Sequence, residues 1–462
     1  GTEPTGVRRL LRHIEPLGQI ARAARFYPAR LAVIVFAAII VVVTGLLSLP
    51  IATTSGERAN FLDALFTATS AVCVTGLSTV DTAAYWSTFG HVVIILAAAV
   101  GGLGVMTLAS LLSLAVSRHV GLTQRMLAAS ENQSRLGEVG RLLRAVIYTA
   151  AGCELLLTLM LLPPFLSHGL DVGHALWYAV FMALSIFNNA GFVIMPEGLE
   201  AYSTDWWIGL PIILGTFMGA VGFPVILDIM GRRRRPRTWS LHTKLTLTTY
   251  LALTVASTIA IATFEWNNPL TYGSLPTSGK IMTALVNGVN ARSSGLSTIP
   301  PEHMHEATWF LQDALMFVGG GSASTAGGIK VVRVLTAVKI IRNEFRRILH
   351  PRAVLTLRIN QDNLGPEVVQ SIFAYTCFFI LLVTVGASTL IVMGLPLFDA
   401  LGLSISAFSN VGPSIGYAIG PLDSWNELHD GGLYVTSFLM IAGRLEIFAF
   451  LLPFVPSFWR EY

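Results

Sequence analysis

Four glycines along the chain each follow a short apolar stretch and precede a longer one. They are Gly76, Gly191, Gly295 and Gly412. The order around each is the same: an apolar helix, a short helix running into a turn of small residues, and a second apolar helix. The word Gly-Leu-Ser-Thr occurs at both Gly76 and Gly295. Four such units in one chain can surround a single axis with four backbone turns, the geometry that replaces the hydration shell of a monovalent cation.

The composition places most of the chain in a lipid bilayer. Only 12% of its residues are charged and 53% are hydrophobic, whereas a soluble protein carries about 25% charged residues. Several runs with at most two charges approach or exceed the length of a membrane span, about 20 residues. They lie at 31–50, 91–116, 145–166, 206–230, 245–264, 368–393 and 433–454. With a weaker run beginning near Trp309, the sequence predicts eight transmembrane helices and an all-α membrane protein.

The segments before the glycines are too short to cross a bilayer, so they predict four re-entrant pore helices. Residues 60–72 show the pattern best, because Asn60 or Asp63 near the start would cap the helix or favour its positive end. The carbonyl end of such a helix favours a cation near the membrane centre. With the glycines in register, Ser70, Ser185, Val289 and Ser406 stand at the same position, six residues before them.

The distribution of positive charge predicts the topology. Of the 30 Lys and Arg residues, only Arg58, Lys280 and Arg292 lie in the segments with short helices, and only Arg444 lies deep in a span. The others lie at the termini or between units, so both termini and these connections are expected to be cytoplasmic. We therefore divide the chain into a basic N-terminus at 1–30 and pore repeats at 31–118, 119–231, 232–350 and 351–462. All four repeats run in parallel, as a pseudo-fourfold ring around one pore requires.

The residues expected to form a selectivity filter are the glycines and the two residues before each. They are Val74-Thr75-Gly76, Asn189-Ala190-Gly191, Ser293-Ser294-Gly295 and Asn410-Val411-Gly412. Glycine allows a turn to present its carbonyls through backbone angles that other residues resist. One such turn is more often a plain re-entrant bend, but four in register favour a selectivity filter for a monovalent cation. Each unit keeps one filter glycine, so we expect weaker discrimination than in a symmetric potassium-channel filter.

A glycine- and serine-rich stretch interrupts the third inner helix. It comprises Gly319, Gly320, Gly321, Ser322, Ala323, Ser324, Thr325, Ala326, Gly327 and Gly328. From Trp309 to Val318 the helix covers only about 15 Å, so the stretch is expected to break it below the filter and face a water-filled pore. The alternative is a cytoplasmic linker, which would leave the span too short. The stretch lacks the Gly-Lys-Ser/Thr ending of a phosphate-binding loop.

Several motifs of this sequence resemble those of the Trk/Ktr/HKT superfamily of potassium transporters, in its bacterial KtrB/TrkH branch. The matching runs include 69–77, 187–192 and 290–295 around the first three turns, 101–107 in the first inner helix, 326–330 after the glycine-serine stretch and 443–446. They occur in order and cover the chain from about residue 31 to residue 454. The fourth turn, Ser409-Asn410-Val411-Gly412-Pro413, is more similar to the Trk side.

The resemblance implies gated K⁺ uptake through a homodimer with one pore per subunit, in the bacterial cell membrane. It also implies a cytoplasmic ring of nucleotide-binding RCK-type regulatory subunits. In the family, the loop corresponding to 319–328 obstructs the path and moves on activation, and by analogy Arg444 meets it. K⁺ is the transported ion; no cofactor is expected on this chain, nor a nucleic-acid partner. The basic run at 232–235 could bind anionic lipid or the ring, or only set the topology.

Two further buried charges have open assignments. Arg292 adjoins the third filter turn, and we expect its side chain to point behind the filter and hold the turn by hydrogen bonds to carbonyls. Glu154, in the second outer helix, could pair with Arg444 or with another helix, and no transport role follows from its position. Histidines such as His91 and His174 show no metal-ligand spacing.

The main alternative to a gated pore is a Na⁺- or H⁺-coupled carrier with alternating access. Parallel repeats and a fixed filter argue against rocking halves. An enzyme is not expected, because the spans lack His-Glu-x-x-His and Gly-x-Ser-x-Gly.

Overall fold

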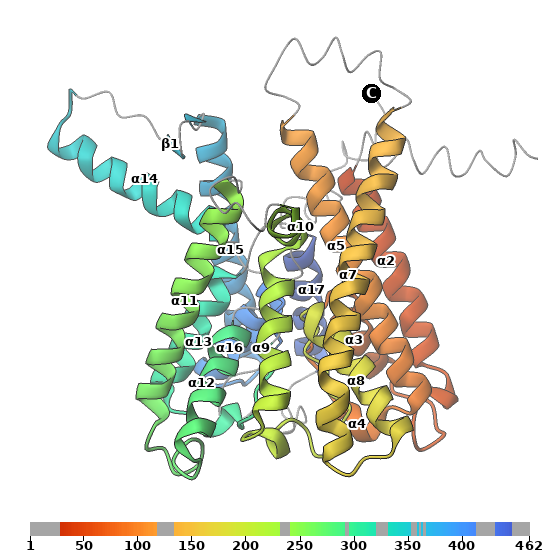
Figure 1. Cartoon of the computed structure of the whole chain (residues 1–462). Helices are drawn as coiled ribbons and strands as arrows, with labels where there is room; N and C mark the ends of the chain where they lie inside the picture. Colours follow the sequence, from red (N-terminus) through yellow and green to blue (C-terminus); the bar gives the residue numbers. More distant parts are fainter. Residues whose placement is uncertain are drawn as a thin grey trace, which may run out of the picture.

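The computed structural model describes residues 28–117, 134–231, 241–291, 295–319, 331–352, 358–359, 362–363, 366–412 and 430–445. Within these ranges the regular secondary structure is helical, apart from an isolated bridge between Thr53 and Trp86 and a short ladder in which β1 (Arg358–Ile359) pairs antiparallel with β2 (Asp362–Asn363). The prediction of an all-α fold is confirmed in this sense. Long helices run along the bundle in Figure 1, and shorter ones lie between them in its lower half.

Each repeat contains an outer helix, a short helix and an inner helix. The first has α2 (Pro28–Leu47), α3 (Phe61–Val72) and α5 (Thr88–Ser117); the second has α7 (Ser134–Ser167), α8 (Val172–Phe187) and α9 (Trp206–Val221), continued by α10 (Phe223–Gly231). The third has α11 (Leu241–Glu265), α12 (Thr277–Asn290) and α13 (Glu306–Val318); the fourth has α15 (Pro366–Val392), α16 (Leu397–Ser409) and α17 (Asp430–Arg444). The domain boundaries drawn from the sequence stay a prediction.

Shorter elements connect these helices. They are η1 (Pro50–Ala52), α4 (Thr82–Tyr85), η3 (Glu200–Tyr202), η5 (Pro301–His303) and α14 (Val331–Leu349). Helix α14 leaves the bundle at the upper left of Figure 1.

By length and composition, four helices within the described ranges can cross a membrane. They lie at Thr88–Thr107, Gly140–Ser167, Thr243–Glu265 and Ile372–Val392. The pair α9 and α10 adds a fifth if it counts as one span, but it is bent by 99°. The predicted span at 206–230 is therefore not one unbroken helix: Gly222 has a φ of 95°, and Pro224 has no N–H with which to continue the helix. The count of eight spans stays a prediction.

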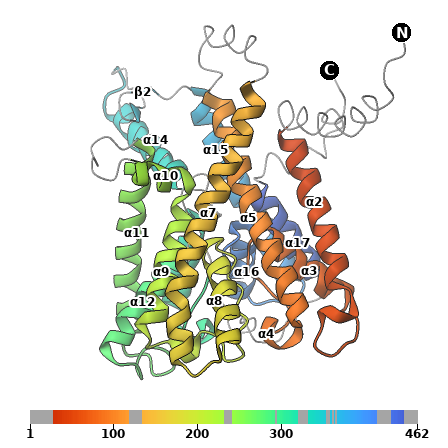
Figure 2. The same cartoon turned by 45° about the vertical axis from the view of Figure 1, so that its right-hand side comes forward.

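The helices of neighbouring repeats pack in a closed cycle. Each short helix contacts the outer helix of its own repeat, as α3 contacts α2 and α8 contacts α7. It also contacts the inner helix of the preceding repeat: α8 contacts α5, α12 contacts α9, and α16 contacts α13. The cycle closes where α3, the first short helix, contacts α17, the last inner helix. Figure 2 shows α17 beside α3 and α16 inside the bundle.

Small residues let the inner helices approach the ends of the short helices. Gly101 lies against the carbonyl oxygen of Val72, Gly219 against that of Phe187 and Gly443 against that of Phe408, so that an added Cβ would overlap each oxygen. Val72, Phe187 and Phe408 each stand four residues before a turn glycine. One contact thus recurs in register in three repeats, and it sets the depth of the turn relative to the inner helix.

We expect Gly443→Ala to lower the melting temperature of the purified protein in detergent. Its new Cβ would meet the Phe408 carbonyl oxygen and the Asn410 side chain, and overpacking costs about 1–3 kcal/mol. Gly152→Ala, on the helix α7, is the matched control, because nothing lies within 4 Å of its Cβ position. Thermal unfolding followed by fluorescence compares the two, and equal melting temperatures would contradict the contact.

Candidate functional site

The turns after α3, α8 and α16 share a rare backbone conformation. Within the described ranges, the non-glycine residues with positive φ are Val74, Asn189 and Asn410, each at 55°. Each stands two residues before a turn glycine, and these glycines also have positive φ, between 76° and 110°. A β-branched residue such as Val74 rarely adopts this region. Strain of about 1–3 kcal/mol per residue persists only where the surroundings enforce it, which is typical of functional sites.

Serines six residues before the glycines hold these turns. The Oγ atoms of Ser70 and Ser406 accept hydrogen bonds from the N–H groups of Gly76 and Gly412, both at 3.0 Å. In the second repeat, Ser185 Oγ instead donates to the carbonyl of Phe192 at 2.8 Å. The sequence register aligned these serines without suggesting their role. The feature of the sequence that could have indicated this role is a hydroxyl side chain at a position that is otherwise buried and apolar.

The third repeat has Val289 at the serine position and cannot form this bond. There the N–H of Gly295 donates to the carbonyl of Asn290 at 2.8 Å. Gly295 has a φ of 69°. Ser293, Ser294 and Arg292 lie outside the described residues, so their predicted places in the filter and behind it stay predictions.

The first turn contacts both the second and the fourth turn. Gly76 lies against the carbonyl oxygen of Ala190, and Gly412 lies against that of Thr75, so closely that a Cβ on either glycine would overlap the oxygen. The side-chain amide of Asn410 donates to Thr75 Oγ1 at 2.9 Å. Backbone segments that are far apart in sequence thus place main-chain oxygens against glycines of neighbouring turns, in the order fourth, first, second.

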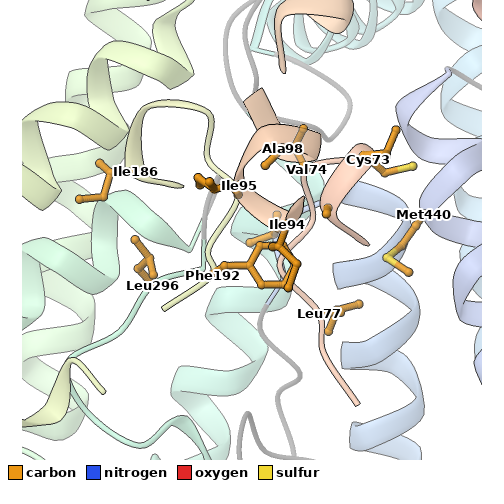
Figure 3. Close-up of a cluster of buried hydrophobic side chains, with 14 of the residues drawn as sticks. Cys73, Val74, Leu77, Ile94, Ile95, Ala98, Ile186, Phe192, Leu296 and Met440 are labelled. Atoms are coloured by element: carbon orange, nitrogen blue, oxygen red, sulfur yellow. The ribbon is translucent and has the colours of Figure 1, made fainter. Parts of the chain in front are cut away.

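Apolar side chains surround this meeting point. The residues that follow the first three glycines, Leu77, Phe192 and Leu296, are buried, and Figure 3 shows them around Val74 with Ile94 and Ile95 of α5. In this view Met440 of α17 lies at the right of the group, and Leu296 lies at its left. Such packing fixes turns that carry few regular backbone hydrogen bonds.

Arg444 lies at the end of α17 and reaches the first turn. Its Nε donates to the carbonyl of Cys73 at 2.8 Å, and one terminal nitrogen donates to that of Val74 at 3.4 Å. The residue is 6% exposed. The guanidinium therefore caps the carbonyl end of α3 and offsets its partial negative charge. Its expected contact with the glycine-serine loop involves residues outside the described ranges and stays a prediction.

Of the two expected partners of Glu154, Arg444 or another helix, the structure shows the second, at the C-terminal cap of α8. The side-chain amide of Asn188 donates to Glu154 Oε1 at 3.1 Å. Asn188 directly precedes Asn189, the first expected filter residue of its repeat. The carboxyl group of the second outer helix thus lies behind the second turn.

The predicted gate can be traced only at its start. Helix α13 ends at Val318, and Gly319 follows with a φ of 73°. The expected break in the third inner helix therefore begins at the predicted residue. Residues 320–328 of the loop lie outside the described ranges, so a gating role for Gly319 and the rest of the stretch stays a prediction.

A buried carboxylate that the sequence did not single out fixes the start of α13. Glu265 is fully buried and accepts four hydrogen bonds. The donors are the N–H of His305 at 2.7 Å, Thr308 Oγ1 at 2.6 Å, Asn268 Nδ2 at 2.7 Å and Thr271 Oγ1 at 2.8 Å. A carboxylate at a helix start is favourable, and this one ties α11 to α13. The sequence feature that could have identified it is a glutamate at the end of an apolar run.

The described part of the chain offers no cluster of three His, Cys, Asp or Glu residues that could hold a metal ion. The oxygens gathered at the turns are main-chain carbonyls and a few hydroxyls and amides. Such neutral oxygens suit a partly dehydrated alkali cation better than a transition metal.

The fold and these turns define a class of protein: a helical membrane protein with strained turns gathered inside its bundle. A family model described as TrkH, cation transport protein, matches residues 22–461. The chain therefore belongs to the TrkH family of cation transport proteins, in agreement with the resemblance drawn from its motifs.

Several characterised proteins are similar to the chain. It is 32% identical over 448 residues to the Ktr system potassium uptake protein B of Bacillus subtilis (strain 168), with 95% of each chain covered. It is 30% identical over 408 residues to the protein of the same name from Vibrio alginolyticus, with 87% of this chain and 85% of that one covered. The crystal structure of the potassium transporter TrkH from Vibrio parahaemolyticus has a TM-score of 0.74 at 19% identity, covering 92% of this chain and 85% of that one. The last likeness shows the fold alone.

Proposed function

We propose that this protein is a gated pore for K⁺ uptake across the bacterial cell membrane. The observation that carries the proposal is the recurrence of one strained conformation in register, at Val74, Asn189 and Asn410, in three turns of which the first contacts the other two. K⁺ is proposed as the ion because the similar proteins are named potassium uptake proteins. In this proposal the four turns form one selectivity filter, and main-chain oxygens replace the water that K⁺ loses.

The closed cycle of helix contacts supports a ring of four parallel repeats around one axis. A carrier with alternating access requires one half of the protein to move against the other. Here each short helix packs on the inner helix of the preceding repeat, including α3 on α17. Such a movement would break two of these contacts, so a fixed filter is favoured over a Na⁺- or H⁺-coupled carrier.

The proposal includes the topology and the partners that the sequence suggested. The basic connections between repeats and both termini face the cytoplasm, in accord with the positive-inside rule. The pore subunit forms a homodimer and binds a cytoplasmic ring of nucleotide-binding regulatory subunits. Membrane lipids contact its apolar helices, and the chain itself performs no covalent chemistry.

Uptake of radioactive Rb⁺ into liposomes tests the function. We expect the purified protein to take up Rb⁺, competing K⁺ to inhibit this uptake, and Na⁺ to inhibit it much less. Currents in planar bilayers then separate the two mechanisms, because a pore conducts far faster than a carrier turns over. Rb⁺ uptake that requires a Na⁺ or H⁺ gradient, without channel-like currents, would support the carrier instead.

Deletion of residues 322–326 tests the gate. The loop follows Gly319 at the inner end of α13, where we place the obstruction of the path. We expect the shortened protein to raise basal Rb⁺ flux at least several-fold without regulatory subunits. A variant that elutes as the parent does in size-exclusion chromatography, yet is equally slow, would refute a gating role for the loop.

A further inference from the structure

Glu154 places a carboxyl group in the part of α7 that can span a membrane. An ionisable side chain at such depth is costly unless it has a partner. The described contacts of the Glu154 carboxyl lead to one side chain, the amide of Asn188, at 3.1 Å. A partly buried polar group that keeps a single specific partner points to a positioning role.

Asn188 is held from three directions. It is the C-terminal cap of α8, and its main-chain N–H donates to the carbonyl of Leu184. Its side-chain amide also donates to that carbonyl, at 3.0 Å, besides binding Glu154. The side-chain oxygen lies against Gly102 of α5, where an added Cβ would overlap it. The amide is therefore fixed between the outer helix of its own repeat and the inner helix of the first.

The residue that this clamp holds is the one before a strained position. Asn189 follows with a φ of 55°, and Ala190 after it presents its carbonyl to Gly76 of the neighbouring turn. A shift of Asn188 would thus move both the second turn and its contact with the first.

The first turn has a corresponding arrangement with the opposite charge. Cys73 and Asn188 occupy the same register position, three residues before the turn glycine. Cys73 binds Arg444 through its carbonyl, and Asn188 binds Glu154 through its side chain. Two neighbouring turns are therefore each anchored by an ionisable side chain of another helix, Arg444, which is buried, and Glu154, which is partly buried.

We propose that Glu154 is a positioning residue for the second filter turn and acts through the side-chain amide of Asn188. The inference rests on the proposed function, because it assigns Glu154 to the ion selectivity of that filter. Loss of the acceptor frees the Asn188 amide, widens the range of positions open to the Ala190 carbonyl and weakens the distinction between K⁺ and Na⁺.

The test compares Glu154→Leu, Glu154→Gln and Asn188→Ala in Rb⁺ uptake with competing Na⁺. We expect Glu154→Leu and Asn188→Ala each to lower the Rb⁺/Na⁺ preference about three- to tenfold, in line with the loss of one hydrogen bond. Glu154→Gln keeps an oxygen acceptor and remains within about twofold of the parent. Adding Glu154→Leu to Asn188→Ala produces no further loss, since both act on one interaction.

Two more variants separate positioning from general damage. Gly102→Ala displaces the Asn188 oxygen from another helix and should reproduce the loss of preference. Glu344→Leu is the control. Glu344 is exposed on α14 and pairs with Arg347, away from the turns, so this variant should have the same ion preference as the parent protein.

The outcomes are distinct. If Glu154→Leu is folded and keeps the parent's ion preference, or if its effect adds to that of Asn188→Ala, the positioning role is overturned. A loss in Glu154→Gln as large as in Glu154→Leu also overturns it, because the acceptor would then be irrelevant. If Glu154→Leu does not fold, the Rb⁺/Na⁺ preferences of Asn188→Ala and Gly102→Ala decide the matter: a loss in both supports the positioning role, and the parent's preference in both overturns it. A parent protein without Rb⁺ preference overturns the proposed function itself, and this inference with it.

Discussion

Gly76→Ser removes most of the preference for K⁺ over Na⁺ and slows Rb⁺ uptake, and Gly412→Ser does the same. Gly76 has a φ of 92° and Gly412 one of 110°, where a side chain is strained by about 1–3 kcal/mol. Each new Cβ would also overlap a main-chain oxygen of the adjacent turn, that of Ala190 or Thr75. Because backbone cannot rotate away as a side chain can, the carbonyls must move, and every 1.4 kcal/mol is about a tenfold change in an equilibrium.

The matched control for these variants is Gly394→Ser. Gly394 has a φ of 106° but open space around its Cβ position, so it carries the backbone strain without the contact. It should lose some stability and keep the parent's ion preference. The measurement is Rb⁺ uptake at several Na⁺ concentrations, for protein that reaches the membrane. Unchanged ion ratios in both Gly76→Ser and Gly412→Ser would remove the basis for assigning the filter.

Arg444→Ala is expected to raise basal Rb⁺ flux several-fold and to lower thermal stability. In the proposed pore, the guanidinium is a fixed positive charge near the inner end of the filter, where it repels an incoming cation. Its removal lowers this barrier. It also leaves the carbonyls of Cys73 and Val74 without the donors at 2.8 Å and 3.4 Å, and hydrogen bonds to charged groups contribute about 1.5–3 kcal/mol.

Arg444→Lys separates the two effects. An ammonium group keeps the charge but cannot reproduce the planar fork that reaches both carbonyls. We therefore expect flux close to that of the parent, with a melting temperature between those of the parent and Arg444→Ala. Liposome flux and detergent melting curves of the three proteins provide the comparison. Equal flux in all three would show that the charge does not limit permeation.

Local patterns predicted the helical part of the fold well. Asn60 does cap α3, accepting a hydrogen bond from the N–H of Leu62 at 3.2 Å, and α13 does end before Gly319. These are signals within one turn of chain, where residue type and geometry are directly linked. The bend at Gly222 was missed because hydropathy measures only how apolar a segment is, not the direction of its backbone. Residues 206–230 are predominantly apolar, and only Gly222 and Pro224 mark the break.

Contacts between repeats could not be predicted in the same way. Arg444 binds Cys73 across nearly the whole chain, and Glu154 binds Asn188 from another helix. No spacing rule links such residues, because their proximity depends on how the repeats pack. The glycine register indicated where the turns lie. That Val74, Asn189 and Asn410 would take left-handed angles has no signature in a valine, although asparagine tolerates them.

The contact between α3 and α17 has a consequence for biosynthesis. The first short helix needs a surface that belongs to the inner helix of the fourth repeat, which is synthesised after the other three repeats. The segments of the first repeats must therefore insert into the membrane and remain partly assembled until α17 has been synthesised and inserted. Nascent chains stalled before α17 should be sensitive to proteases, and the N-terminal half expressed alone should not mature.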